Sequence, residues 1–419
     1  MATTSQHLLL SPAELAYLHS TLSLTPPLRP DGRTATQFRP LTAETGILPG
    51  TNGSARVCFA DGTEAVVGVK AEVGKTTSVA ILDENKSSKQ PRPRRRKQAK
   101  SQGALKPAAA IEGEEEDEED DEDDGKAKEA LLAEPYGEND WLELSVEIPG
   151  SRDDDSGTVF LATMLSEALL ADGELTKKLW INRRFHWKLY LDIILISPPL
   201  SYPLPLLSLT THLALLATRL PRLKSEGDED PMFDDDWAAS QFIYARSGAG
   251  ATATTNTTSR PPITLLVMVV GENVIFDPSK EELAVADCAL AVSVGETSNG
   301  RIDDTAAAAA MDIDGSADAE AKPSTRALRL LSVRTIDPPS RLTAPGVPNA
   351  VNAAAWGQGA PAVKETGLRA AETGDVEGVW KAPRGGSKIT VINTIVEKIL
   401  ERGGVADEVL EGLDGVELA

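Results

Sequence analysis

The chain has 419 residues, of which 64 are acidic and 42 basic, so its formal net charge is −22. Only 4% of the residues are aromatic, and the apolar residues gather in blocks separated by runs of Ala, Gly, Pro, Ser, Thr and charge. This distribution excludes a packed core over the whole length. We expect one folded domain of roughly 240 to 280 residues that carries insertions.

The most apolar stretch, residues 189–220, is interrupted by four prolines and lacks the uninterrupted apolar run of a membrane span. The first residues lack the basic and apolar regions of a signal peptide. We therefore expect a soluble intracellular protein without membrane contact. Cys58 and Cys288 are too few for a disulfide framework or a zinc site, and we expect two buried, reduced thiols.

The first predicted element is a helix over residues 11–22. Ser11 is a favoured N-cap, Pro12 suits the first helical position, and Glu14 completes a capping box. Residues 53–71 then alternate in apolar character around Asp61-Gly62, which predicts a β-hairpin with a type I′ turn.

Residues 74–135 change character. They hold the basic run Arg92–Lys97, and all but one of the residues in Glu112–Asp124 are acidic. Blocks of like charge repel themselves, so we expect a disordered insertion. The basic run fits nucleic-acid binding or nuclear import as well as it fits a solvated charge run.

Order is expected to resume with a strand over 141–148 and a helix over 158–171. Residues 187–197 are almost continuously apolar, which predicts a strand buried on both faces. The run 204–220 is apolar on all sides and predicts a central helix that ends before Pro221.

The second half predicts strands over 263–270, 274–277 and 328–333 and a closing helix over 387–402, which Gly403-Gly404 ends. Residues 281–294 carry a further apolar run. Low-complexity insertions are expected at 246–260, 295–325 and 337–385. This mixture of hairpins and helices predicts an α+β fold with a mixed sheet.

Common catalytic motifs are missing from the sequence. Residues 68–76 resemble a phosphate-binding loop, but five residues separate Gly68 from Gly74 where four are needed, so we interpret them as a strand end. None of the four histidines has a partner at metal-ligand spacing, and no Gly-x-Ser-x-Gly sequence occurs. We predict no metal, no cofactor and no catalytic triad.

Several stretches resemble the RNase PH family, and within it the non-catalytic ring subunits of exosomes. The match covers roughly residues 8–72, 138–220 and 262–400. The sequences that carry the resemblance are Leu10–Glu14, Leu28–Arg33, Arg39-Pro40, Thr45–Ile47, Gly53–Val57, Gly62–Ala71, Trp187–Ile196 and Phe276–Glu282.

The resemblance implies an RNase PH-type fold, also described as ribosomal protein S5 domain 2-like, with a mixed β-α-β-α arrangement. Residues 1–73 with 136–225 would form the N-terminal subdomain, and residues 226–419 the C-terminal subdomain. It also implies a six-membered ring around a channel. The implied partners are other RNase PH-like ring subunits, S1/KH cap subunits, an associated hydrolytic exoribonuclease and RNA.

Two features depart from the active members of this family. Those members bind phosphate through Gly-Ser/Thr-Arg at the helix after the central strand, where this chain has the sequence 199–204 with two prolines and no glycine or arginine. They also carry two aspartates six residues apart, and an ungapped alignment places Leu283 and Ala289 there. A gap could bring Asp287 to one of those positions, but not to both. We predict no catalytic residue.

The resemblance therefore implies an inert structural subunit that supports 3′-to-5′ RNA processing and decay in the nucleus, nucleolus and cytoplasm. Arg152, Arg183 and Arg184, in loops beside the core, are the candidate RNA contacts. Plain surface arginines remain an alternative for each. Two other functions stay open: an active phosphorolytic 3′-to-5′ exoribonuclease, and an RNA-binding scaffold that acts through the charged tracts.

Overall fold

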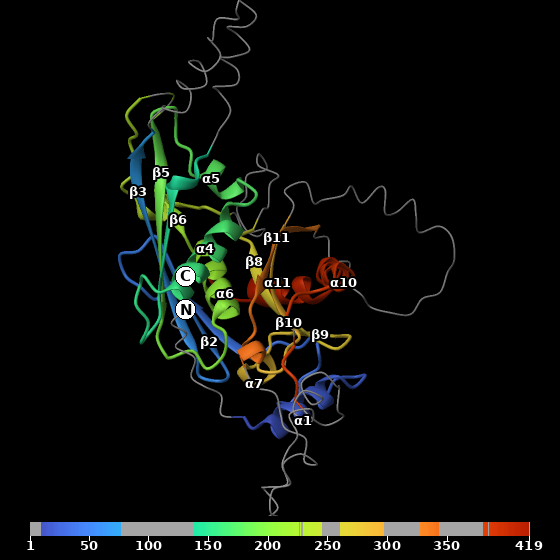
Figure 1. The fold of residues 1–419 in the computed structure, drawn as a ribbon. Coiled ribbons are helices and arrows are strands. Elements are labelled where there is room, and N and C mark those ends of the chain that lie inside the picture. Colours follow the sequence, from blue (N-terminus) through green and yellow to red (C-terminus); the bar gives the residue numbers. More distant parts are fainter. Residues whose placement is uncertain are drawn as a thin grey trace, which may run out of the picture.

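The computed structural model describes residues 10–76, 137–244, 260–296, 327–342 and 380–418, except residues 226, 228 and 384. Two sheets face each other across a layer of helices (Figure 1). The helices are α1 (Pro12–Leu22), α4 (Ser156–Leu170), α5 (Glu174–Lys178), α6 (Leu204–Leu216), α7 (Lys280–Leu283), α10 (Ile389–Leu400) and α11 (Val405–Asp414), with 3-10 turns η1 (Asn139–Trp141), η2 (Trp237–Ala239) and η3 (Pro339–Leu342).

The first sheet has the strand order β1-β2-β3-β5-β4. Its strands are β1 (Leu41–Thr45), β2 (Gly53–Phe59), β3 (Glu64–Lys75), β4 (Leu142–Glu147) and β5 (Phe185–Leu195). β4 pairs with β5 in parallel and all other neighbours are antiparallel. The predicted α+β fold with a mixed sheet is therefore confirmed. β1 was not predicted, because its five residues, LTAET, alternate half-buried and exposed positions and none is buried.

The second sheet is antiparallel with the order β11-β10-β8-β9. Its strands are β8 (Ile263–Val270), β9 (Asn273–Phe276), β10 (Cys288–Glu296) and β11 (Leu328–Ile336). The internal strand β10 lies in the apolar run 281–294, which also contains most of the short helix α7. That run joins two elements without a turn residue that would separate them in the sequence.

α6 lies between the two sheets, where Figure 1 shows it behind α4. Every one of its thirteen residues is buried. A helix surrounded by protein must be apolar on all sides, which confirms the prediction of a central helix. The helix ends earlier than predicted, at Leu216. Residues Arg219–Leu220 instead form β6, which pairs with β7 (Gln241–Phe242). The Arg219 amide donates to the Asn52 carbonyl.

The strand β5 corrects a second prediction. Its residues alternate between buried and accessible positions, and Ile194 is 40% exposed. The buried face packs on helices, whereas the accessible face carries Lys188, Tyr190, Asp192 and Ile194. The prediction of burial on both faces was therefore wrong for this chain by itself.

The hairpin of β2 and β3 is confirmed, but its turn type was wrong. A type I′ turn needs positive φ at both central residues. Gly62 has φ +84°, whereas Asp61 does not adopt positive φ. The loop instead closes through the Phe59 amide on the Thr63 carbonyl, and the Asp61 carboxylate accepts from the Thr63 amide. Residues 68–75 lie in β3, as expected, and so extend the strand into the start of the predicted insertion.

The rest of the predicted insertions falls mostly outside the described residues, including the basic and acidic runs. The closing helix α10 is confirmed, and a further helix, α11, follows Gly403-Gly404. Cys58 is half-buried and Cys288 is buried, and both are free thiols. Within the described ranges, no helix is long and apolar enough to cross a membrane.

Candidate functional site

The region after β5 is the place where the sequence leads us to look for a phosphate site. The chain turns through Ser201 and Tyr202 into α6, whose N-cap is Pro203 and whose second helical residue is Pro205. Neither proline has an N–H to offer an anion, and no side chain caps the helix. Leu204 is fully buried. The N-terminus of α6 therefore lacks the donors of a phosphate cradle.

Arg39 lies beside this turn, in the segment before β1. Its Nη1 donates to Ser201 Oγ at 2.6 Å and to Asp61 Oδ2 at 2.7 Å. Burial opposes the charged form, but hydrogen bonds and attraction to Asp277 and Asp61 raise the pKa of Arg39 above its ordinary value. Burial alone would raise the pKa of Asp61, but hydrogen bonds from Thr63 and the ion pair with Arg39 lower it overall.

Asp277 accepts the other side of the Arg39 guanidinium. Its carboxylate, fully buried at the end of β9, also accepts from Arg33 Nη1 at 2.9 Å and from the Arg39 amide. Asp277 has φ +46°, a left-handed conformation that Asp tolerates better than most residues. This backbone turns its carbonyl toward Arg29 and Arg33, which both donate to it.

Arg29 completes this arginine–carboxylate cluster, which we define as Arg29, Arg33, Arg39, Asp277 and Glu282. Arg29 and Glu282 are buried and form a two-bond ion pair, with Nε and Nη2 at 2.7 and 2.8 Å from the carboxylate oxygens. Glu282 also accepts from the Ser279 amide in the capping box of α7. The positive charges of the cluster are thus matched by carboxylates of the same chain.

The two positions aligned with the catalytic aspartates of active family members lie in a hydrophobic cluster. Leu283 ends α7 and Ala289 lies in β10, with 7% and 1% of their surface exposed. Asp287, between them, is on the surface and accepts from the Gly271 amide at 2.7 Å. Burial would raise the pKa of Asp287, but hydrogen bonds from His19 and Gly271 lower it overall. Its carboxylate is occupied in holding α1 and the β8–β9 turn.

The three predicted RNA contacts lie at different places. Arg152 is exposed before α4 and pairs with Asp154 at 2.8 Å. Arg184 is exposed beside β5, pairs with Asp230 at 3.1 Å, and lies over the Phe185 ring. Arg183 is its exposed neighbour. Arg183 and Arg184, consecutive in the sequence, are both exposed just before β5, whereas Arg152 lies apart from them in an acidic loop.

Metal ligands do not gather in the described part of the chain, where no group of three His, Cys, Asp or Glu side chains could hold an ion. His19 lies 3.7 Å from Asp287, and His186 stacks on Trp141. The sequence analysis missed the pairing within the arginine–carboxylate cluster. The sequence does contain a signal for it, since Arg29, Arg33 and Asp277-Pro278 all lie in the stretches that carry the family resemblance.

Comparison with curated proteins finds similar chains among exosome components. Exosome complex component RRP42 of Saccharomyces cerevisiae is 28% identical over 299 residues, which are 70% of this chain and 83% of the relative. Exosome complex component rrp42 of Schizosaccharomyces pombe is 29% identical over 301 residues, 68% of this chain and 78% of the relative. The chain is a homologue of these exosome components.

Other comparisons add less. No family model matches the chain. Among solved structures, chains of an archaeal exosome core and of the Archaeoglobus fulgidus exosome with RNA bound to the active site each have a TM-score of 0.41. They are 17% and 16% identical, cover 77% of this chain, and are covered over 84% and 86% of their own length.

Proposed function

We propose that this chain is a structural, catalytically inert subunit of an exosome ring that supports 3′-to-5′ RNA processing and decay. The homology to exosome components over two thirds of the chain supports the assembly. The inert role rests on this chain's own residues.

One observation carries the inert role: the apolar burial of Leu283 and Ala289 where active family members carry aspartates. Their surroundings are the side chains of α1, β8 and β9, so an ion would meet hydrocarbon there. A carboxylate at either position would be buried without a partner, which is costly. The N-terminus of α6 supports the same conclusion, because Pro203 and Pro205 remove donors for phosphate.

The partners in this proposal are other RNase PH-like ring subunits, S1/KH cap subunits, a hydrolytic exoribonuclease and RNA. The site of action is the nucleus and nucleolus, and also the cytoplasm. In this role the exposed apolar side chains of Ile194 in β5 and Ile196 just after it would be covered by a neighbouring subunit.

The test is purification of the tagged full chain from its own cells with identification of the proteins that accompany it. We expect a stable assembly of exosome subunits. The isolated chain is then incubated with 3′-labelled RNA and inorganic phosphate, next to an active RNase PH as positive control. We expect no nucleoside diphosphate from this chain. A solitary chain that degrades RNA only with phosphate would overturn the proposal and establish the enzyme alternative.

A further inference from the structure

A groove follows the free edge of β4. Within the described residues β4 pairs with β5 alone, so its other edge is open. A cavity of about 410 Å³ beside it is lined by the four consecutive residues 144–147 and by residues of α4 and the loop before it. Neighbouring side chains of a strand point to opposite faces. Four consecutive residues in one wall therefore mean that the wall is the backbone edge of the strand.

An open strand edge offers alternate N–H and C=O groups that can pair with a further strand. Proteins use such edges to bind extended peptide segments, in which the main chain gives affinity and pockets for side chains give specificity. The six residues of β4 are enough for a short added strand. The groove has α4 as its second wall, so an added strand would lie between β4 and the helix.

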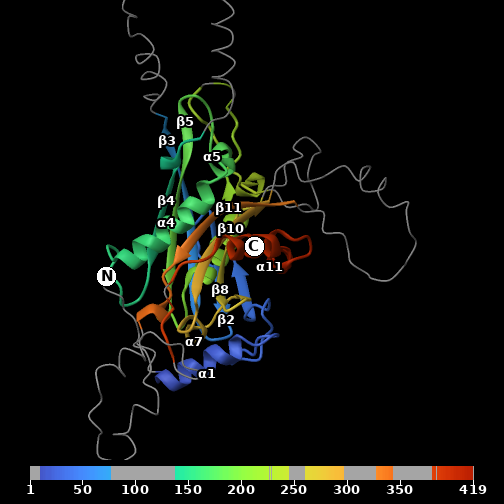
Figure 2. The ribbon, with the colours of Figure 1, turned by 45° about the vertical axis from the view of Figure 1, so that its right-hand side comes forward.

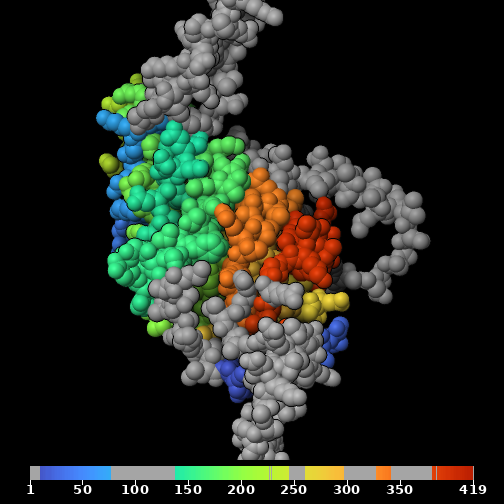
Figure 3. All heavy atoms as spheres, viewed as in Figure 1, coloured from blue at the N-terminus to red at the C-terminus, as the bar shows by residue number. Residues whose placement is uncertain are grey.

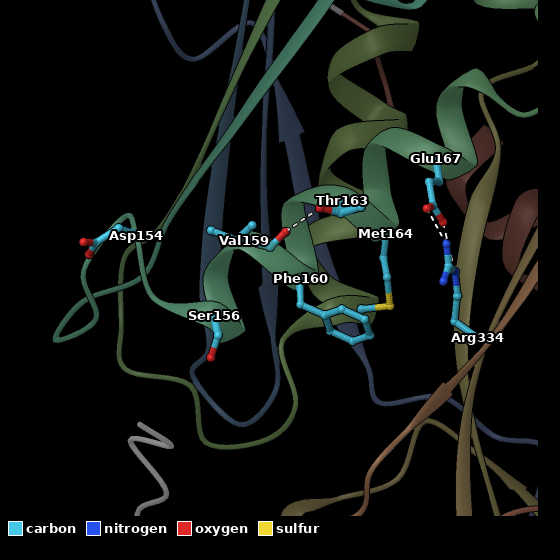
Figure 4. Close-up of a pocket in the computed structure, with 8 residues that line it drawn as sticks. All are labelled: Asp154, Ser156, Val159, Phe160, Thr163, Met164, Glu167 and Arg334. Carbon is cyan, nitrogen blue, oxygen red and sulfur yellow. Dashed lines mark hydrogen bonds and ion pairs between the residues drawn. The ribbon is translucent and has the colours of Figure 1, made fainter. Parts of the chain in front are cut away.

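The α4 wall is partly apolar: Val159 and Ala162 alternate there with Thr158, Thr163 and Ser166. Val159 is 49% exposed. Val159 and Thr163 line the groove and also a second cavity of about 430 Å³ on the other side of the helix. Figure 4 shows the Phe160 ring beside Met164 in this second cavity, next to the ion pair of Glu167 and Arg334. In Figure 3 this green surface lies beside the orange surface of β11.

Carboxylates surround the groove. Glu147 and Asp153 line it and Asp155 lies at the N-cap of α4; none of the three makes an ion pair with a described residue. The nearby Arg152 is already paired with Asp154. In addition, Thr158 is 4% exposed and lines the groove, and its hydroxyl has no partner among the described residues. The groove therefore combines an open strand edge, a partly apolar wall and unbalanced negative charge.

The negative charge of the groove favours a basic occupant over a nucleic acid. A nucleic acid would bring phosphates toward Glu147 and Asp153, and like charges in one site repel. Lysine and arginine side chains match instead, because their aliphatic stems cover Val159 while their charged ends reach the carboxylates. We propose that the groove between β4 and α4 binds an extended basic segment of a partner protein, added as a strand to β4. This proposal does not depend on the ring assembly or on the inert role.

The test uses the full chain and a fluorescein-labelled peptide of six alternating lysines and valines, with fluorescence anisotropy as readout. We expect binding that is at least about tenfold tighter than that of a glutamate–valine peptide. Methylation of alternate peptide nitrogens removes the strand hydrogen bonds and should lower affinity by about tenfold or more.

Two variants locate the site. Glu147→Lys with Asp153→Lys should weaken binding about tenfold or more. The matched control, Glu408→Lys with Glu411→Lys, makes the same charge change at exposed positions of α11 and should leave the affinity unchanged. Val159→Ser tests the apolar part of the α4 wall without a charge change and should also weaken binding.

Four outcomes would overturn the proposal. Equal losses in the groove variant and the α11 control would show attraction to bulk charge only. Indifference to peptide methylation would exclude strand addition. If oligoadenylate RNA binds and displaces the peptide, or if light scattering shows a dimer that the groove variant dissociates, the occupant is RNA or a second copy of this chain.

Discussion

Arg39 and Asp277 form a bidentate ion pair across 238 positions of the sequence. Arg39 Nε lies 2.9 Å from Oδ2 of Asp277, and Nη2 lies 2.7 Å from Oδ1. The pair joins the segment between α1 and β1 to the end of β9, an edge strand of the second sheet. Figure 2 shows α1 lying below both β2 and the second sheet. The arginine–carboxylate cluster thus connects the N-terminal segment to the second sheet.

We expect Asp277→Asn to lower the free energy of unfolding by about 3 kcal/mol, because removal of one partner leaves buried guanidinium charge without compensation. Asn tolerates the left-handed backbone of this position, so the change isolates the charge. Urea denaturation of the full chain measures the loss. As a control, Glu64→Gln breaks the partly exposed pair with Arg56 and should cost less than about 1 kcal/mol. Similar losses in both variants would contradict the role of the cluster.

Gly53 and Gly412 should respond to the same substitution with opposite signs. A Cβ at Gly53 would lie 2.6 Å from the Thr218 Cα and 2.8 Å from the Ala214 carbonyl, because β2 packs directly on the end of α6. We expect Gly53→Ala to destabilise the fold by about 3 kcal/mol. Gly412 in α11 has open space, so Gly412→Ala should stabilise by about 0.5–1 kcal/mol. Thermal unfolding of the two variants checks both signs.

Lys178 should make stability depend on alkaline pH. Burial, only partly offset by attraction to Glu174 and Asp172, lowers the pKa of Lys178 to about 8 from 10.5, and its Nζ lies 3.9 Å from the centre of the Tyr244 ring. Between these two pH values the unfolded chain binds more protons than the folded one, so this group makes stability rise with pH. Its contribution is fully present above 10.5 and is lost as pH falls through 8.

Lys178→Met should therefore remove part of the rise of unfolding free energy between pH 8 and 10.5. The control is Lys177→Met, at the exposed neighbour on the same helix, which should keep the slope of the parent chain. Urea titrations at several pH values measure the three slopes. The same slope for all three chains would refute this account of Lys178.

The RNA contacts can be separated by their salt dependence. If Arg183 and Arg184 each neutralise a phosphate, Arg183→Ala and Arg184→Ala should each reduce the slope of log K against log salt by about one. Arg152 pairs with Asp154 next to Asp153 and Asp155, so Arg152→Ala should change the slope less. Filter binding of the assembled complex to single-stranded RNA at several salt concentrations gives the slopes. Unchanged slopes for all three variants would show that these arginines do not contact RNA.

Local features were predictable from the sequence because their hydrogen bonds span few residues. The Ser11 and Glu14 capping box forms as predicted, with the Ser11 amide 2.7 Å from the Glu14 carboxylate. Gly403 adopts φ +67° and ends α10. The errors came where two elements share one apolar run, as in residues 281–294, or where a strand in an apolar run has one face open to solvent, as at Ile194.

The sequence by itself determined most of the elements, the mixed character of the fold and the absence of common catalytic motifs, since periodicity and turn residues act over a few positions. Only the tertiary structure decided that Arg29, Arg33 and Arg39 would meet around Asp277 and Glu282. It also decided that β4 would leave an edge open beside an acidic groove. Ion pairs and free strand edges depend on which distant segments approach one another in space. The spacing of residues along the chain does not determine that approach.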